Sequence, residues 1–317
     1  MRFVLAFLLA LGCAAAQAQG FPARPVKIVV AFSPGGGTDI VARLLGQKLT
    51  EMWGQQVIVE NRAGASGTIG TEYAAKAPAD GYTLFMGTLG NLSVNKHLYP
   101  KMTVDPIRDF APITKVVDVY FVMVVHPSVP AKNVAELIAL AKSRPGFVTY
   151  GSSGPGGAPH LAAELLKRTA NIDMTHIPYK ASAQSFQDLL GGQVMITMDS
   201  QIQALPYIRD GRLRALGVLS ARRVASLPDV PTIAETVPGY ELTNWFGLVA
   251  PAATPKDLLA KISTDVSKAL QDQGLRDKVT ALSAAVVGDS PEQFGATMRA
   301  DSEKWARIIR EANIKAD

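Results

Sequence analysis

Residues 26–32 read VKIVVAF and residues 33–39 read SPGGGTD, and together they decide the fold. The first run is apolar and has the length of a buried strand, and the second is a glycine-rich turn. A helix is expected next, because apolar residues recur at helical spacing at Ile40, Val41, Leu44, Leu45, Leu49 and Met52. A buried strand that turns directly into a helix predicts an α/β protein.

The order of strand, loop and helix continues along the chain and then begins again. Strands are expected at QVIVEN (56–61) and YTLFMG (82–87), and a second series starts with VYFVMVV at 119–125. Two such units predict an α/β protein with two lobes, mostly parallel sheets and a cleft between the lobes. Helices without an intervening sheet are expected after residue 254, and we expect them to pack back onto the first lobe.

The chain is therefore expected to cross between the lobes twice, near residues 118–124 and again near residues 243–249. These crossings divide the sequence into a first lobe, a second lobe and a leader. The expected limits are 1–18 for the leader, 19–120 with 247–317 for lobe 1, and 121–246 for lobe 2.

The first residues have the layout of a secretory signal peptide. Arg2 is followed by an apolar run and by the small-residue triplet Ala16, Gln17 and Ala18, so cleavage is expected after Ala18. The apolar run is too short for a membrane span. Lipidation at Cys13 is the alternative that we favour less, because no large aliphatic residue stands three positions before it. The exported protein then has no cysteine and no disulfide.

Composition limits the classes of function. The chain has 317 residues, of which 48% are hydrophobic and 19% charged, as in ordinary globular proteins, and this length favours two domains. The formal net charge is +5, but the basic residues are scattered and no basic run is longer than two residues. This pattern argues against a nucleic-acid partner.

The loops after strands are the places to search for a ligand site, because ligands of open α/β sheets bind at the carboxyl ends of the strands. Residues 33–39 place three glycines at a helix start, where free N–H groups and the helix dipole favour an anion. Residues 151–159 repeat this pattern in the second unit. Each loop can instead be only a tight turn or a flexible surface loop, and the residues leave both interpretations open.

Polar residues follow two further strands. Thr88 to Asn91 come after YTLFMG, and Asp199 and Ser200 come after VMITM. Their side chains can complete the hydrogen bonds of a solute, and Asp199 can accept from an amine or a hydroxyl. Helix capping is the competing role, which we favour slightly for Asp199 and Ser200.

The residues give little support for catalysis. The four histidines, which are His97, His126, His160 and His176, have no metal-ligand spacing. The GSSG sequence at 151–154 lacks the pattern of a hydrolase nucleophile, and no set of acid, base and nucleophile emerges. We therefore expect no metal, no cofactor and no enzymatic activity.

Several segments in a fixed order resemble the Bug family of extracytoplasmic solute receptors, the binding components of tripartite tricarboxylate transporters. The resemblance runs from Pro25 to the C-terminus. Its segments are RPVKIVVAFSPGGGTDIVARLL, VIVENRAGASGTIGTE, DGYTLFMG, YGSSGPGG, HIPYK, LLGGQV, GRLRALGV, LPDVPTIAE and WFGLVAPAATP.

This resemblance implies a type II periplasmic-binding-protein fold that closes on a small organic carboxylate. It implies that backbone groups and ordered water hold the carboxylate, and that the receptor serves integral-membrane transporter components from the periplasm. We expect a monomer. Carried over by position, the ligand-binding residues are Phe32, Ser33, Pro34, Gly35, Gly36, Thr88, Asn91, Ser152, Ser153, Tyr179, Lys180 and Asp199.

The sequence departs from the common family pattern in the second lobe. Pro155, Gly157 and Ala158 stand where asparagine or serine is frequent, Ala181 where glycine is usual, and Ser200 where asparagine is frequent. Fewer polar groups suggest a ligand with an apolar or aromatic distal part, although water can replace lost donors.

Two other functions remain open from the residues. A sensory receptor that feeds a signalling partner would use the same site residues. An exported hydrolase or isomerase would use the cleft for turnover, and unchanged recovery of a bound carboxylate would argue against it.

Overall fold

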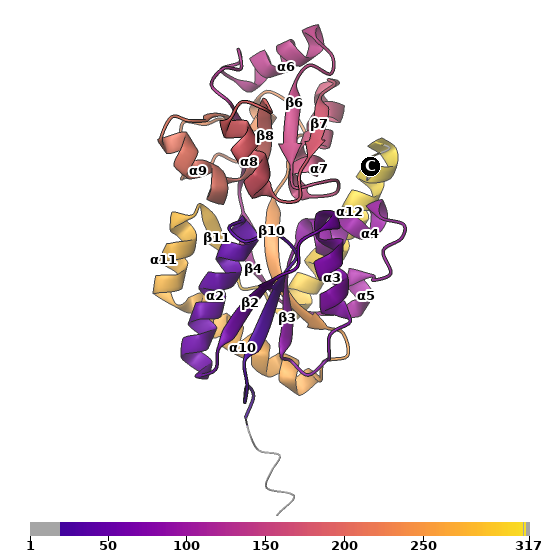
Figure 1. Cartoon of the computed structure of the whole chain (residues 1–317), viewed down its shortest axis with the longest axis vertical. Helices are drawn as coiled ribbons and strands as arrows, with labels where there is room; N and C mark the ends of the chain where they lie inside the picture. Colours follow the sequence, from indigo (N-terminus) through magenta and orange to yellow (C-terminus); the bar gives the residue numbers. More distant parts are fainter. Residues whose placement is uncertain (1–19, 313, 315–317) are drawn as a thin grey trace, which may run out of the picture.

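Two β-sheets organise the computed structural model, which describes residues 20–312 and 314 (Figure 1). The strand order in the first sheet is β11–β4–β10–β3–β1–β2. These strands are β1 (Val26–Val30), β2 (Val57–Asn61), β3 (Thr83–Thr88), β4 (Phe110–Val119), β10 (Asn244–Pro251) and β11 (Ala284–Val286). The predicted signal peptide and Cys13 lie outside the described residues.

The second sheet has the strand order β7–β6–β8–β5–β9. Its strands are β5 (Phe121–Val125), β6 (Thr149–Ser152), β7 (Thr175–Pro178), β8 (Ile196–Ser200) and β9 (Arg214–Val218). Figure 1 shows the two sheets in separate lobes, one above the other. The predicted two-lobed α/β fold is confirmed.

Helices pack around each sheet, as expected for strands that are apolar on both faces. The first lobe carries α2 (Gly37–Trp53), η2 (Ala65–Gly67), α3 (Thr68–Ala75), η3 (Gly90–Val94), α4 (Asn95–Leu98), α5 (Pro106–Asp109), α10 (Lys256–Gln271), α11 (Gln273–Ala281) and α12 (Pro291–Ala312). The second carries α6 (Val134–Ser143), α7 (Ala158–Ala170), α8 (Ser182–Leu190), α9 (Gln201–Arg209) and η4 (Ile233–Glu235).

Both sheets are mixed, whereas the repeated strand and helix pattern predicted mostly parallel ones. β1 pairs in parallel with β2 and β3, and β6 pairs in parallel with β7 and β8. By contrast, β10 pairs antiparallel with β3 and β4, and β5 pairs antiparallel with β8 and β9. Each of these antiparallel pairs, and that of β11 with β4, contains β4, β5 or β10, which are the strands at the crossings, where the chain enters or leaves a lobe without a crossover helix.

The two crossings lie side by side. Val119, at the end of β4, pairs with Asn244, at the start of β10. After a single intervening residue, Tyr120, the chain enters β5 of the second sheet at Phe121. Leu242, which precedes β10, donates its N–H to Leu219 O of the second lobe at 2.9 Å. Two adjacent strands therefore link the lobes, and this is the arrangement of a hinge.

The C-terminal helix α12 packs on the first lobe. Phe294, Met298 and Trp305 are buried on one face of it, and a Cβ added to Gly247 of β10 would lie 2.0 Å from Phe294 Cζ. Only glycine therefore allows β10 and this helix to approach so closely.

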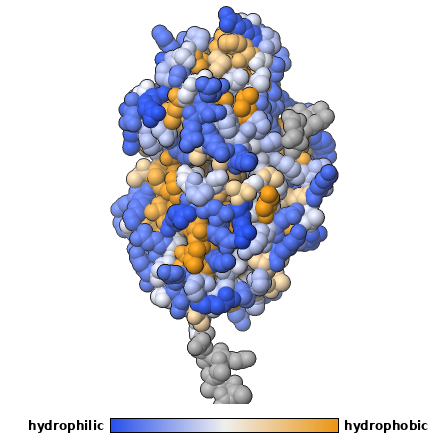
Figure 2. Space-filling model, viewed as in Figure 1, coloured by the Kyte–Doolittle hydropathy of each residue, from blue (hydrophilic) through white to orange (hydrophobic). Residues whose placement is uncertain are grey.

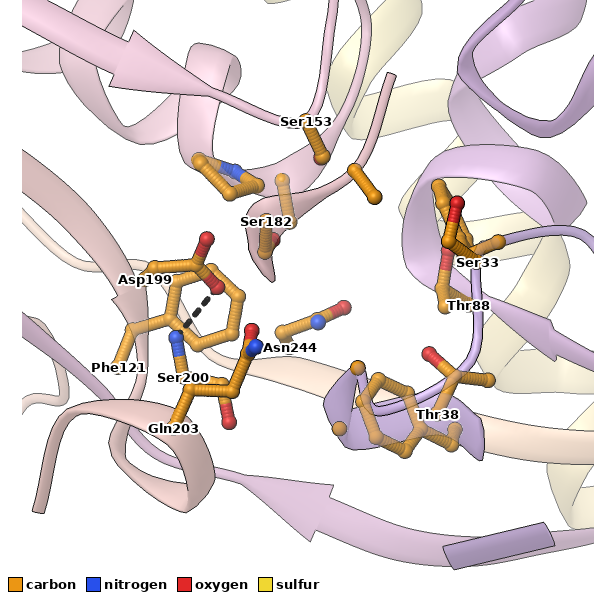
Figure 3. Close-up of a pocket in the computed structure, with 17 residues that line it drawn as sticks. Ser33, Thr38, Thr88, Phe121, Ser153, Ser182, Asp199, Ser200, Gln203 and Asn244 are labelled. Atoms are coloured by element: carbon orange, nitrogen blue, oxygen red, sulfur yellow. Dashed lines mark hydrogen bonds between the residues drawn. The ribbon is translucent and has the colours of Figure 1, made fainter. Parts of the chain in front are cut away.

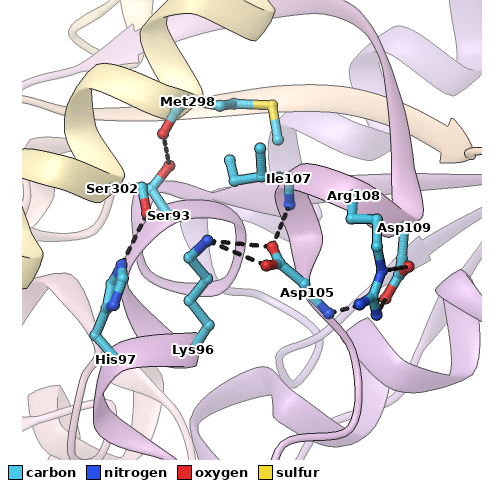
Figure 4. Close-up of polar contacts among 9 residues, drawn as sticks. All are labelled: Ser93, Lys96, His97, Asp105, Ile107, Arg108, Asp109, Met298 and Ser302. Atoms are coloured by element: carbon cyan, nitrogen blue, oxygen red, sulfur yellow. Dashed lines mark hydrogen bonds and ion pairs between the residues drawn. The ribbon is translucent and has the colours of Figure 1, made fainter.

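Polar contacts fix α12 against η3 and α4 (Figure 4). Ser93 Oγ donates to Met298 O at 3.0 Å, and His97 Nε2 lies 2.8 Å from Ser302 Oγ. Nearby, Asp105 caps α5 by accepting from Ile107 N at 2.9 Å. The C-terminal helix α12 therefore belongs to the first lobe, together with strand β1 and helix α2.

The face seen in Figure 2 is mainly hydrophilic and carries smaller apolar areas. Large hydrophobic side chains that are exposed among the described residues include Met52, Ile58, Ile69 and Tyr73. In the described part of the chain, no helix is both long and apolar enough to cross a membrane.

Candidate functional site

A cavity lies between the two lobes, next to the hinge (Figure 3). The empty space inside it, counted together with its open mouth, is about 480 Å³. The lining residues come from both lobes and from the crossing strands. They are Phe32, Ser33, Gly36, Gly37, Thr38, Thr88, Phe121, Ser153, Ala158, Pro159, Ala181, Ser182, Asp199, Ser200, Gln203, Asn244 and Phe246.

The first-lobe wall is the start of helix α2. Gly36 is its N-cap and has no side chain to cap the helix, so the first N–H groups of α2 have no side-chain acceptor there. Together with the helix dipole, these donors favour an anion in the cavity. Gly35, just before the cap, has φ of 83°, a conformation that glycine adopts without strain.

Asp39 holds this loop in shape. Its Oδ2 accepts from Gly35 N at 3.0 Å and from Arg43 Nε at 2.9 Å, and its Oδ1 accepts from Asn61 Nδ2 at 2.9 Å. Burial disfavours the Asp39 anion, but Arg43, Gly35 N–H and Asn61 outweigh it and hold the pKa of Asp39 below its usual value. An ionised Asp39 therefore orders the loop without facing the cavity.

Thr88, at the end of β3, extends the same wall. Asn91 orients it, because Asn91 Oδ1 accepts from Thr88 N at 2.6 Å and from Thr88 Oγ1 at 2.9 Å. Asn91 itself is fully buried and does not line the cavity. The structure thus gives Asn91 a positioning contact with Thr88.

The second-lobe wall includes the start of α7 and the loop after β6. Gly157 caps α7 without a side-chain hydrogen bond, as Gly36 caps α2. Ser153, Ala158 and Pro159 face the cavity, whereas Ser152 points into the lobe. Ser152 Oγ lies 2.6 Å from His176 Nε2 and accepts from Gly154 N at 3.0 Å. It therefore holds the loop in place from the side that faces away from the cavity.

His176 is neutral at physiological pH. Burial, the ring of His160 stacked on it at 4.5 Å and the nearby Lys167 lower the pKa of His176 to about 3. A neutral imidazole beside Ser152 is a hydrogen-bond partner in a packed network. Within the described residues no cluster of metal-ligating side chains occurs.

Tyr179 and Lys180 do not line the cavity. The Tyr179 hydroxyl donates to Asp188 Oδ2 at 2.7 Å, and burial together with Asp188 raises the pKa of Tyr179 to about 12. Lys180 is exposed, and its backbone N–H donates to Gln184 Oε1 at 3.2 Å. The loop after β7 instead contributes Ala181 and Ser182.

Asp199 and Ser200 end β8 at the hinge side of the cavity. Ser200 Oγ accepts from Ile202 N at 3.1 Å and so caps α9, which is the role we favoured for it. Asp199 Oδ1 accepts from Ser200 N at 2.6 Å, while its buried Oδ2 has no hydrogen-bond partner among the described residues. Burial raises the pKa of Asp199 to about 6, against the opposing effect of the Ser182 hydroxyl and the Ser200 N–H.

The structure gathers half of the candidate ligand-binding residues around the cavity. Those that line it are Phe32, Ser33, Gly36, Thr88, Ser153 and Asp199, and those that do not are Pro34, Gly35, Asn91, Ser152, Tyr179 and Lys180. The lining residues that we did not expect as ligand contacts include Thr38, Phe121, Ser182, Gln203, Asn244 and Phe246. Thr38 belongs to the loop of residues 33–39, and Asn244 and Phe246 belong to the predicted crossing near residues 243–249. Their places in these two segments were a signal in the sequence that they could line the cavity.

Comparisons with known proteins identify the family to which the chain belongs. Residues 41–314 match the family described as tripartite tricarboxylate transporter family receptor. Protein BugT of Bordetella pertussis is 36% identical over 312 residues, which cover 98% of this chain and 96% of BugT.

Solved structures show the same fold. Rpa4515 of R. palustris, solved with adipate, superposes with a TM-score of 0.90 at 38% identity, covering 93% of this chain and 99% of that one. MatC from Rhodopseudomonas palustris, solved with bound malate, superposes with a TM-score of 0.87 at 31% identity, covering 91% and 100% of the two chains. The chain therefore belongs to the receptor family of the tripartite tricarboxylate transporters, whose motifs its sequence resembles.

Proposed function

We propose that this receptor captures a small organic carboxylate in the cavity between its lobes and delivers it to the membrane components of a tripartite tricarboxylate-type transporter. The observation that carries the proposal is the uncapped start of α2, which opens into the cavity at Gly36. Such N–H groups bind an anion without a basic side chain, and the described lining contains no Lys, Arg or His. Relatives that were solved with adipate and with malate support a carboxylate as ligand.

We also assign a role in ligand binding to each wall of the cavity. We assign lobe 1 to residues 19–120 with 247–317 and lobe 2 to residues 121–246. The first-lobe loop, Phe32 to Gly36, holds the carboxylate, and Thr88 and Ser153 complete its hydrogen bonds from the two sides. Asn91 and Ser152 do not contact the ligand: Asn91 positions Thr88, and Ser152 positions the loop that carries Ser153. Pro34 and Gly35 determine the conformation of the first-lobe loop.

We further propose a location, an oligomeric state and a mode of action for the receptor. The signal peptide of residues 1–18 exports it to the periplasm, where it acts as a monomer without cofactor or metal. It returns its ligand chemically unchanged, because binding and closure are sufficient for delivery. Membership of a transporter receptor family supports the periplasmic location and the role in delivery.

A thermal-shift experiment tests the proposal. A ligand that binds only the folded state stabilises it by about 2.7 kcal/mol at 100 times its Kd, which corresponds to roughly 5 °C in a protein of this size. We expect at least one member of a panel of mono- and dicarboxylates to produce such a shift. If no carboxylate in a broad panel shifts the melting temperature, the proposal fails.

A further inference from the structure

A loop of the second lobe, residues 154–157, lies directly on the first lobe. Gly154 and Gly156 have positive φ, of 101° and 80°. A Cβ added to Gly154 would be 2.5 Å from Ser66 Oγ, and one added to Gly156 would be 2.8 Å from Asn95 Oδ1. A side chain on either glycine would therefore displace a first-lobe residue. The loop needs glycine both for its backbone conformation and for its approach to the other lobe.

Further residues extend this contact at the boundary between the lobes, where Figure 1 shows α4. A Cβ added to Gly90 of η3 would be 3.1 Å from Gly156 O, and the Cβ on Gly156 would be 2.9 Å from Leu98 Cδ1 and 3.3 Å from Tyr99 Cε2. None of these residues lines the cavity. The lobes therefore meet at a second place, which is separate from the proposed ligand site.

Tyr99 supplies a hydrogen bond across this contact. Its hydroxyl donates to Pro155 O of the second lobe. Its backbone N–H donates to Asn95 O at 2.9 Å and so holds Tyr99 at the end of α4. Because the donor and the acceptor belong to different lobes, the bond from the hydroxyl forms only while the lobes are together.

Asn95 opposes the same contact. Its Nδ2 donates to Ser66 O at 2.9 Å, and its Oδ1 faces Gly156. This Oδ1 is buried and has no hydrogen-bond partner among the described residues. A buried acceptor without a partner is costly, whereas the same atom can bind water when the lobes separate. One hydrogen bond is thus set against one unpartnered acceptor, so the contact can form and break readily.

An ion pair also joins the lobes, but on the surface. Arg168 Nη2 of α7 lies 3.1 Å from Glu311 Oε2 of α12, and both side chains are about half exposed. Exposed ion pairs contribute little, because water and salt screen them. Removal of this pair is therefore a matched control for removal of the Tyr99 bond.

We infer that Tyr99 and the loop of residues 154–157 form a latch that sets the balance between the open and the closed receptor without touching the ligand. The inference rests on the proposed function, since it assumes that a bound carboxylate favours the closed form. It adds Tyr99 as a positioning residue outside the cavity. When the closed form is only partly populated, the affinity falls with its population, so a broken latch weakens binding of every ligand by the same factor.

Distances between spin labels on the two lobes measure the latch directly. The only cysteine of the sequence, Cys13, lies in the predicted signal peptide, so the exported protein can be labelled at Lys101→Cys in lobe 1 and Lys142→Cys in lobe 2, which are both exposed. The distances are recorded without ligand and at half-saturation with malate, succinate or adipate. Tyr99→Phe should lower the ratio of closed to open receptor by roughly two- to tenfold, the net effect of one hydrogen bond.

The control for this measurement is Glu311→Gln, which should leave the ratio nearly unchanged. An unchanged ratio in Tyr99→Phe under both conditions would overturn the inference. An equal loss in Glu311→Gln would do the same, because any contact between the lobes would then have this effect.

Two alanine variants separate the latch from backbone strain. Gly156 and Gly239 both lie in lobe 2 and have similar φ, of 80° and 83°, so alanine is strained to a similar extent at each. Only at Gly156 would the added Cβ meet the first lobe, since a Cβ on Gly239 has nothing within 4 Å. Gly156→Ala should therefore lower the closed fraction, and Gly239→Ala should not. Equal closure of the two folded variants would contradict the latch.

Calorimetry with malate, succinate and adipate distinguishes a latch from a ligand contact. Tyr99→Phe should raise the Kd of each acid that binds by the same factor, up to about tenfold. A change in the ratio of these Kd values would show that Tyr99 acts on the ligand itself and would overturn its role in the latch. If no carboxylate binds the wild-type protein, the proposed function fails, whereas the spin-label distances of the ligand-free protein still decide whether the latch exists.

Discussion

Gly37 and Ser200 meet across the cavity: a Cβ on Gly37 would lie 3.4 Å from Ser200 Oγ and 3.5 Å from both Ile202 Cδ1 and Phe246 Cζ. Gly37 belongs to the first lobe and Ser200 to the second. The lobes therefore approach each other closely at the start of α2. A side chain larger than that of alanine at this position would therefore extend into Ser200, Ile202 or Phe246.

Gly37→Val should keep the lobes apart. A Cβ alone fits at ordinary contact distance, but the two methyl groups of valine would extend into Ser200, Ile202 or Phe246. Small-angle scattering with a saturating carboxylate should show a larger radius of gyration than for the wild-type protein. The matched control is Gly37→Ala, whose Cβ alone would stay at ordinary contact distance, 3.4 Å from Ser200 Oγ and 3.5 Å from Ile202 Cδ1 and Phe246 Cζ. If Gly37→Val closes as completely as the wild-type protein, the contact does not limit closure.

Asp199→Asn should stabilise the ligand-free protein at neutral pH. Because burial raises the folded pKa of Asp199 to about 6, the folded state binds more protons than the unfolded state between pH 4 and pH 6. Ionisation therefore lowers the free energy of unfolding as the pH rises through this window, by an amount on the order of 3 kcal/mol above pH 6. The asparagine variant avoids this loss.

Urea unfolding at pH 4 and pH 8 measures the effect. The variant should gain stability over the wild-type protein at pH 8 and little at pH 4. A wild-type protein that is more stable than the variant at pH 8 without ligand would show that Asp199 is already paired in the empty receptor.

Ser152→Ala should destabilise the second-lobe wall. It leaves His176 Nε2 and Gly154 N without their buried partner, which costs about 1–3 kcal/mol, and it frees the loop that carries Ser153. Ligand affinity should fall as well. Ser128→Ala is a fitting control, because Ser128 also pairs with a histidine, His126 at 2.7 Å, but on the exposed surface. Equal effects of the two substitutions on unfolding would contradict this role of Ser152.

The apolar runs predicted the strands well because they are buried on both faces. VKIVV and FVMVV form β1 and β5, and the glycine-rich loops lead into α2 and α7 as expected. Strand direction was harder to predict, since the side chains of β10 do not reveal whether its neighbours run parallel or antiparallel. The direction follows instead from the hinge, where the chain crosses without a helix.

The site residues were only partly predictable, because the direction of a side chain also depends on the tertiary structure. The sequence places Ser152 and Ser153 next to each other, but successive side chains at a strand end point in opposite directions. Ser153 therefore faces the cavity, while Ser152 turns toward His176. Asn244 and Phe246 line the cavity because the crossing strand passes beneath it, which depends on tertiary structure and not on a local motif.

The most direct test of the account is native mass spectrometry of the exported protein purified without refolding, alongside its Gly36→Val variant. Valine fits the backbone at Gly36, which has φ of −76° and ψ of 161°, but its side chain would occupy the position that we propose for the carboxylate. We expect one small carboxylate per wild-type protein, released chemically unchanged, and none on the folded variant. A folded Gly36→Val variant that retains the same ligand, or a wild-type protein that returns it chemically altered, would contradict the account.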